Sequence, residues 1–315
     1  MVVERLPRLK ATKVSPELTE FSMFSTDVSV ANAIRRIMIA EVPTLAIDLV
    51  TLEQNSSPLH DEFIVHRLGL LPIDSRDVES YKFREQCPCS SHCVKCTVQF
   101  SLDIMCDGDE VTVTHLDIQP VASGYSTRIP MPMPQGEGAQ GIRICKLRKG
   151  QRLKCTLTAV KGIGKLHAKW IPATPAVYRH EPRIHIYKTR SETLSQEIKK
   201  AIVDCCPRRV FELRSDDVFS DGDDGTLEVA NAEACIFCGE CEELCHTSGL
   251  SRMIRISEHD DRFHFSVESS GAMPAYQIVE IALGILGDKL QDLDEELNPT
   301  KKEVYDTKQY SLDLN

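Results

Sequence analysis

Residues 27–73 read DVSVANAIRRIMIAEVPTLAIDLVTLEQNSSPLHDEFIVHRLGLLPI, and this stretch decides the fold. Its first part predicts an amphipathic helix, because four apolar side chains recur at helical spacing on one face: Val30, Ile34, Ile37 and Met38. Pro43 is expected to end this helix. Residues 44–57 then predict a strand, and residues 60–73 predict a short helix followed by a turn that contains Gly and Pro.

Two polar features interrupt these apolar patterns. Arg35 and Arg36 lie off the apolar face of the first helix, and the pattern alone favours a solvated helix face for them. His66 lies within the second helix, where a hydrogen-bonded structural histidine is the simpler interpretation than a metal ligand or a catalytic base.

Length and charge exclude several classes of protein. A chain of 315 residues can bury two or three domain cores, and its composition (42% hydrophobic, 27% charged) is ordinary for a globular protein. The net charge of −10 argues against direct nucleic-acid contact, which needs a basic surface. Neither a signal peptide nor an apolar run long enough to cross a membrane is evident, so we expect an intracellular protein.

The rest of the chain alternates strands and helices, which indicates the α+β class. We expect strands at 97–106, 110–118, 141–147, 151–160, 182–189 and 208–213, and a helix within 191–205. Residues 143–154 form a basic ribbon that suits a solvated hairpin face as well as a partner contact. Residues 253–258 and 262–269 alternate strongly and predict a hairpin that turns at EHDD, residues 258–261. The acidic run 216–224 predicts a solvated loop.

The last predicted element is a long helix that begins after Pro274. One apolar stripe contains Val279, Leu283, Leu286, Leu290 and Leu293, and a second contains Ile278, Ile281, Ala282 and Ile285. A helix that is apolar on two faces must bury both. One face can pack on the chain's own sheet, and we expect the other to contact a second polypeptide rather than one larger core.

Thirteen cysteines in an intracellular chain indicate metal ligands rather than disulfides. Residues 87–96, CPCSSHCVKC, place four thiols close together: Cys87, Cys89, Cys93 and Cys96. Four soft sulfur ligands without an open position suit structural Zn²⁺. His92 could replace a ligand, but the four cysteines already complete a tetrahedral shell.

A second cysteine group, CIFCGECEELC at residues 235–245, has the spacing of a bacterial-type ferredoxin. With the distant Cys206-Pro207 it offers ligands for one cluster, 4Fe–4S or 3Fe–4S: Cys206, Cys235, Cys238 and Cys241. Cys245 has no second cluster to serve, and Cys205 could replace Cys206. The same thiols could also hold zinc or no metal. A single cluster without a second cofactor suits a structural role better than electron transfer.

Residues 27–73 closely resemble the alpha-like subunits of cellular RNA polymerases, a family that includes bacterial alpha, its archaeal counterpart and the third-largest subunit of eukaryotic RNA polymerase II. The zinc loop 87–96 and KGIGKLHAKWIPA at 161–173 are similar to the polymerase II member in particular. The ferredoxin-type run is similar to the cluster-bearing domain of the archaeal member.

This resemblance implies a discontinuous dimerisation domain built from residues 1–45 and 251–315. It also implies a mainly β insert domain at 46–175 that holds the zinc, and a small ferredoxin-like domain at 176–250. A smaller alpha-like subunit would pair with the dimerisation domain, and the second-largest subunit and small zinc-binding subunits would then dock. The expected interface residues are Val30, Ile34, Arg35, Arg36, Ile37, Leu283, Leu286 and Leu290.

The resemblance therefore implies a nuclear, non-catalytic assembly subunit of RNA polymerase II, whose catalytic residues lie in other subunits. Two alternatives compete with it. One is a ferredoxin-like electron-transfer protein, which would leave most of the chain unexplained. The other is the related subunit shared by polymerases I and III, which generally lacks the zinc loop.

Overall fold

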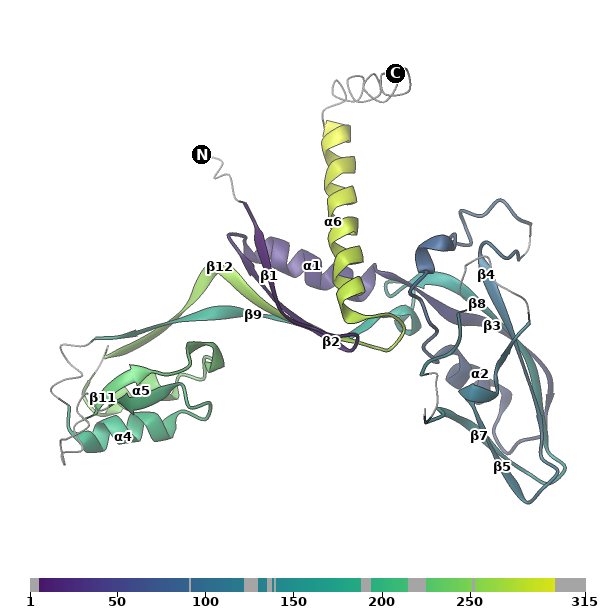
Figure 1. Cartoon of the computed structure of the whole chain (residues 1–315), viewed down its shortest axis with the longest axis horizontal. Coiled ribbons are helices and arrows are strands. Elements are labelled where there is room, and N and C mark those ends of the chain that lie inside the picture. Colours follow the sequence, from purple (N-terminus) through teal and green to yellow (C-terminus); the bar gives the residue numbers. More distant parts are fainter. Residues whose placement is uncertain are drawn as a thin grey trace. The chain divides into compact units, whose positions relative to one another are not determined.

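The structure is a computed structural model of the whole chain, and Figure 1 shows its helices and strands. It describes residues 6–90, 92–121, 130–134, 138, 140–187, 194–214, 225–250 and 253–297. The predicted acidic loop at 216–224 lies outside these residues. The fold is mixed α+β with antiparallel strand pairs, as predicted. No helix among the described residues is long and apolar enough to cross a membrane.

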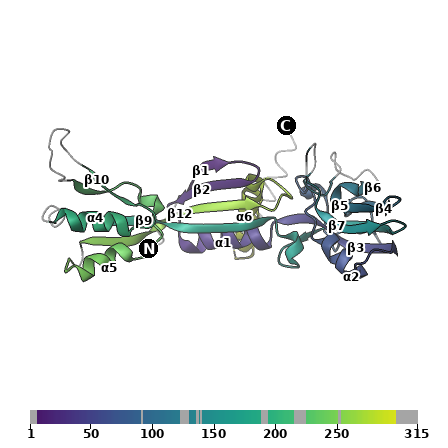
Figure 2. The ribbon, with the colours of Figure 1, turned by 90° about the horizontal axis from the view of Figure 1, so that it is seen from below.

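One sheet is built from strands near both ends of the chain. Its strands are β1 (Arg8–Val14), β2 (Leu18–Phe24), β9 (Ala173–Ile186) and β12 (Ile254–Ser269), in the order β1-β2-β12-β9, which can be followed in Figure 2. Phe21 of β2 stacks on Phe265 of β12 with ring centroids 4.7 Å apart. This contact joins segments more than two hundred residues apart in the sequence.

The predicted hairpin at EHDD is wrong, because β12 continues through residues 258–261 as a single strand. All residues of β12 are described, and none has the positive φ that tight hairpin turns need. The stretch contains no Gly or Asn to favour such a turn. Asp260 and Asp261 are exposed on the extended strand, so water hydrates their carboxylates and the charges do not require a turn.

Two predicted helices are confirmed. Helix α1 (Val28–Ala40) buries Ala31, Ile34, Ile37 and Met38, and helix α6 (Ala275–Leu297) buries residues of its N-terminal half only. An ion pair between Lys289 and Glu41 connects α6 to the residue that follows α1. Gln277 in the first turn of α6 donates a 2.7 Å hydrogen bond to the carbonyl oxygen of Arg76.

The central part of the chain forms two further sheets. The strands predicted at 97–106, 141–147 and 151–160 are confirmed. The strand predicted at 110–118 ends at Thr114, because Thr114 and Asp117 cap a short helix over residues 115–117. The larger sheet has the order β3-β8-β4-β6, and the smaller pairs β5 with β7. Their strands are β3 (Pro43–Asn55), β4 (Thr97–Met105), β5 (Glu110–Thr114), β6 (Gln119–Pro120), β7 (Arg143–Arg148) and β8 (Arg152–Ile163). Strand β8 is central and mostly buried, with Ala159 opposite Ile47 on one side and Val98 on the other. Short helices η1 (Val78–Ser80), α2 (Asp61–Gly69), η2 (His115–Asp117) and η3 (Ala168–Trp170) connect these strands.

The segment after β9 contains helix α4 (Gln196–Cys205), hairpin strands β10 (Phe211–Arg214) and β11 (Thr226–Val229), turn η4 (Ala232–Ala234) and helix α5 (Glu240–Thr247). A small apolar core holds them together, with Ile202, Phe211 and Leu227 buried in it. The chain divides into two compact units, of which one contains Tyr178–His264, Ser22–Val28 and the described residues before Lys10. The remaining residues form the other unit. The four-part division implied by the resemblance stays a prediction.

Gly164 generates the first testable prediction, because a Cβ atom there would overlap the carbonyl oxygen of Ile39 and lie 2.9 Å from Cγ1 of Ile171. The carbonyl oxygen of Ile39 is held by helix α1 and cannot move away, so Gly164→Ala should lower the free energy of unfolding by about 1–3 kcal/mol. Gly108→Ala is the control, since nothing lies within 4 Å of its Cβ position. Chemical denaturation of both variants provides the measurement, and equal stability would contradict the close approach.

Candidate functional site

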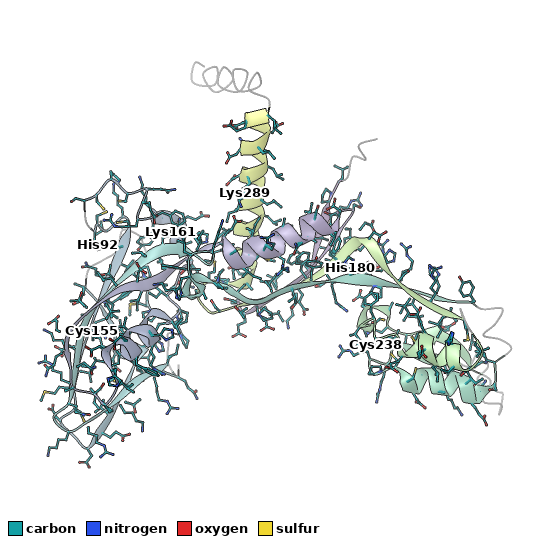
Figure 3. All side chains as sticks on the ribbon, turned by 180° about the vertical axis from the view of Figure 1, so that it is seen from behind. His92, Cys155, Lys161, His180, Cys238 and Lys289 are labelled. Atoms are coloured by element: carbon teal, nitrogen blue, oxygen red, sulfur yellow. The ribbon has the colours of Figure 1, made fainter. Side chains whose placement is uncertain are left out.

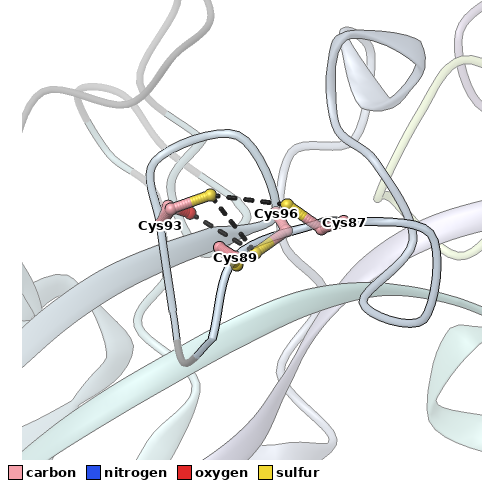
Figure 4. Close-up of side chains that lie close together, drawn as sticks. All are labelled: Cys87, Cys89, Cys93 and Cys96. Carbon is pink, nitrogen blue, oxygen red and sulfur yellow. Dashed lines mark hydrogen bonds between the residues drawn. The ribbon is translucent and has the colours of Figure 1, made fainter.

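The four cysteines of residues 87–96 converge, as the sequence predicted. They lie in the loop that precedes β4, and their sulfur atoms are all within 4.8 Å of one another (Figure 4). The Sγ atom of Cys93 is 3.6 Å from those of Cys87 and Cys96, and that of Cys89 lies 3.6 Å from that of Cys96. Cys87 and Cys96 are buried, whereas Cys89 and Cys93 are half-buried. Among the described residues, no other group of three or more such ligands is as compact.

This geometry fits one tetrahedral metal ion. Zn–S bonds of about 2.3 Å in a tetrahedron place the sulfurs about 3.8 Å apart, close to the separations found here. His92 is exposed and does not belong to the compact group, so the structure places four thiols, and no imidazole, around the centre. The sulfurs would supply a closed shell without an open position for substrate, which suits a structural site rather than a catalytic one.

Backbone hydrogen bonds hold the loop in the shape that brings the sulfurs together. The amides of Cys96 and Thr97 both donate to the carbonyl oxygen of Cys93, each at 3.0 Å. Arg84 donates from Nη1 to the carbonyl oxygen and to Sγ of Cys89, both at 3.4 Å. The sequence interpretation missed Arg84, because nothing in its local pattern marks it as a neighbour of the cysteines.

The thiols of this group differ in acidity. A hydrogen bond from the Lys95 backbone lowers the pKa of Cys93 to about 7, whereas hydrogen bonding to Cys87 raises the pKa of Cys89 to about 12. Thiolates are the ligand form, so metal binding must release protons from the remaining thiols.

The ferredoxin-type cysteines are arranged differently. Cys206 ends helix α4, Cys235 follows η4, Cys238 is exposed, and Cys241 lies in α5. These four sulfurs do not form a group within 4.8 Å. The cysteine ligands of an iron–sulfur cluster lie farther apart than those of a single ion. The separation of these four sulfur atoms therefore neither supports nor contradicts a cluster site. The iron–sulfur cluster therefore stays a prediction without geometric support.

Three cysteines of this region behave as core residues. Cys235, Cys241 and Cys245 are buried with Ile202 and Phe211, and burial raises the pKa of Cys241 to about 12. Burial also raises the pKa values of Cys235 and Cys245. Neutral thiols are small and weakly polar, so they pack well among apolar side chains.

Helix α6 presents the second candidate site, an uncovered apolar stripe. We call Leu283, Leu286, Leu290, Leu293 and Leu297 the leucine stripe. Leu290 and Leu297 are 58% and 70% exposed, Leu283 and Leu293 are also exposed, and Leu286 is half-buried. The second predicted apolar stripe includes Ile278 and Ala282, which are buried in the chain's own core. One apolar face of the helix thus packs on the chain's own core, and the leucine stripe is exposed to solvent.

Helix α1 contributes fewer accessible side chains than the sequence interpretation proposed. Ile34 and Ile37 are 1% and 4% exposed, so they pack inside the chain itself. Val30 is half-buried. Arg35 is half-buried and donates to Oδ1 of Asn32 from Nη2 at 2.9 Å, and Arg36 is exposed. Among the five predicted interface residues of this helix, the two arginines and Val30 retain accessible surface for a partner.

The comparisons with known proteins point to one family. A family model described as the RNA polymerase Rpb3/Rpb11 dimerisation domain matches residues 20–290. The chain is 36% identical over 296 residues to DNA-directed RNA polymerase II subunit rpb3 of Dictyostelium discoideum, covering 93% of this chain and 95% of that one. It is 39% identical over 294 residues to an Arabidopsis thaliana protein, subunit 3 of DNA-directed RNA polymerases II, IV and V, covering 91% and 90%.

A relative of another class is also similar. The Dictyostelium discoideum subunit rpac1 of DNA-directed RNA polymerases I and III is 31% identical over 291 residues, which cover 88% of this chain and 78% of that protein.

Proposed function

The chain belongs to the RNA polymerase Rpb3/Rpb11 dimerisation-domain family, and we propose that it is the non-catalytic assembly subunit of a nuclear DNA-directed RNA polymerase II. The leucine stripe on α6 carries this proposal. It is an apolar surface on a long helix at the end of the family match, and exposed apolar surfaces of this kind mark sites of contact with a second polypeptide.

The partner for this surface is a smaller alpha-like subunit. The family description names a dimerisation domain, which supports a heterodimer formed through the dimerisation elements. Leu286 is half-buried between the anchored and the open half of α6, so it is placed to join the chain's core to the interface. Arg36 on α1 offers an unburied guanidinium for polar contacts at the same surface or at a later docking step.

Assembly with further subunits is the next step of the proposal. The second-largest polymerase subunit and small zinc-binding subunits would dock on the heterodimer, as the family resemblance implies. The phosphoryl-transfer residues would belong to other subunits. Direct nucleic-acid contact is not part of this role, since the chain carries a net charge of −10.

The polymerase II assignment is favoured over the subunit shared by polymerases I and III. The Dictyostelium and Arabidopsis relatives from polymerase II described above match at 36% and 39% identity over at least 90% of their length. The Dictyostelium relative from polymerases I and III matches at 31% over 78% of its length. The four-cysteine loop supports the same choice. An electron-transfer function is disfavoured, because it would explain residues 235–245 and leave most of the chain without a role.

We assign Zn²⁺ to the four-cysteine centre, because four thiolates at these separations suit this ion best. Cys93→Ser should lower the zinc content by about one atom per chain and destabilise the β3-β8-β4-β6 sheet that follows the loop. His92→Ala is the matched control, since His92 is exposed in the same loop and should leave the zinc count unchanged. Metal analysis of both purified proteins gives the answer, and an unaltered count in Cys93→Ser would remove the site.

The interface prediction concerns Leu286 and Leu290. Changing both to glutamate places two charges in the proposed contact, and two lost leucines are worth about 3 kcal/mol or more, or at least about a hundredfold in affinity. Gln291→Glu adds a charge on the same helix but off the leucine stripe, and it should bind normally. Co-purification with the small alpha-like subunit is the measurement. Undiminished recovery of the double variant would reject the stripe as the interface.

The iron–sulfur question has a separate test. The chain is purified without oxygen, together with whatever co-elutes, and iron, sulfide and zinc are counted per chain. About four irons with one zinc would establish a cluster at the ferredoxin-type cysteines, and about three irons would indicate the smaller cluster. Zinc without iron would show that these thiols serve the apolar core alone or hold a second zinc.

A further inference from the structure

The segment KGIGK, residues 161–165, touches two features that are far apart in the sequence. Its first residue contacts the base of the zinc loop, and its last residues contact the C-terminal end of helix α1. We infer that Lys161 is a positioning residue through which metal binding at the four-cysteine centre steadies the end of α1. This inference rests on the proposed metal site and goes beyond the proposed assembly role.

The Lys161 ammonium is enclosed by groups from the zinc-loop base. Its Nζ donates a 3.0 Å hydrogen bond to the carbonyl oxygen of Tyr81 and lies 4.9 Å from the centroid of the Phe83 ring. The side chain is half-buried, and burial lowers its pKa while the charge of Glu79 opposes that shift. A carbonyl and a ring face therefore compensate for part of the hydration that the cation loses. Figure 3 labels Lys161.

Residues 81–84 are in turn fastened to the cysteine loop. The amide of Lys82 donates to the carbonyl oxygen of Lys95 at 2.9 Å, next to Cys96. The amide of Cys87 donates to the carbonyl oxygen of Arg84 at 3.3 Å. These bonds close the loop at its base on both sides of the cysteines. When a metal ion fixes the four sulfurs, the groups that hold Lys161 are fixed with them.

The other end of the segment is pressed against α1 and Trp170. A Cβ atom at Gly162 would overlap the indole ring of Trp170, and one at Gly164 would overlap the carbonyl oxygen of Ile39. The amide of Lys165 donates a 2.8 Å hydrogen bond to the carbonyl oxygen of Ala40, the last residue of α1. The backbone of residues 162–165 is therefore closely packed. A shift of Lys161 must displace Lys165, whose amide caps the C-terminal end of α1.

A second lysine, Lys169, lies beyond the segment in η3 and makes contacts that do not reach the zinc loop. Lys169 Nζ lies 4.4 Å from the Trp170 ring centroid and donates to Asp48 Oδ1 at 2.6 Å and to the carbonyl oxygen of Ile47 at 3.1 Å. Like Lys161 it contacts a ring face and a backbone carbonyl, and it also pairs with Asp48, but these partners lie in β3 and η3 and not at the zinc loop. Lys169 is thus the matched control.

Hydrogen exchange of the full zinc-loaded chain tests the inference. In the native protein, removal of zinc by a chelator should speed exchange of the Lys165 amide by about tenfold or more. In Lys161→Met, this amide should already exchange faster with zinc bound, and chelation should change its rate by less than about twofold. Amides of the β5-β7 pair, such as those of Val111 and Leu147, report whether the whole unit has unfolded.

Two further variants test whether Lys161 links zinc binding to the end of α1 or only fills space in the packing. Lys161→Arg keeps a cation that can donate to Tyr81, so it should restore zinc-dependent exchange at Lys165. Lys169→Met should leave the zinc dependence intact. If zinc-loaded Lys161→Met shows native exchange at Lys165, or if its zinc dependence equals that of the native protein, the inference is overturned. Metal analysis of the same sample reports whether the native chain binds zinc. A native chain without zinc would reject the proposed metal site instead of the inference about Lys161.

Discussion

The end of strand β8 is the constraint on which the larger unit depends. The β3-β8-β4-β6 sheet and helix α1 meet where Gly162 and Gly164 approach Trp170 and Ile39 so closely that neither position has room for a Cβ atom. The Lys165 amide then satisfies a carbonyl at the end of α1 that has no partner within the helix. A glycine loses extra conformational entropy on folding, so two of them in one short segment are explained by close packing rather than by local preference.

The stability of helix α6 depends on its two halves in different ways. Its first half is anchored by Ile278, Val279 and Ala282, and by the bond from Gln277 to residue 76. Its second half keeps apolar side chains in water, where each exposed leucine forgoes about 1.5–3 kcal/mol of burial. The helix is held at one end by the chain's own core, so the open half is pre-ordered. A partner therefore does not have to supply the free energy of folding it.

Sequence patterns recovered the elements whose signals are local. Helix α1, helix α6, strand β3 and the four-cysteine loop were predictable, because spacing in the chain sets which of their side chains share a face or a centre. The EHDD stretch failed, because charge was read as a turn signal while the neighbouring strands kept it extended. Ile34 and Ile37 were predicted as interface residues, yet an apolar face does not reveal whether it meets the chain's own core or a partner. The contact of Lys161 could not be predicted, since Tyr81 lies 80 residues away in the sequence. Arg84 lies only 5 residues from Cys89, but no local pattern marks an arginine as a neighbour of a thiol.

The two cysteine groups show that a cysteine side chain can act either as a metal ligand or as a small residue packed in an apolar core. At residues 87–96 four sulfur atoms converge on one point, and a bound metal ion compensates for bringing four thiols together. At residues 235–245 burial raises the pKa of three thiols, and they fill the core beside Ile202 and Phe211 as small apolar groups would. A domain of this kind can keep ferredoxin-type spacing without a cluster, because exchanging those thiols for larger or charged residues would disturb its packing. The two groups therefore differ in geometry as well as in spacing: among the described residues, only the thiols of residues 87–96 converge to the separations that a single metal ion requires.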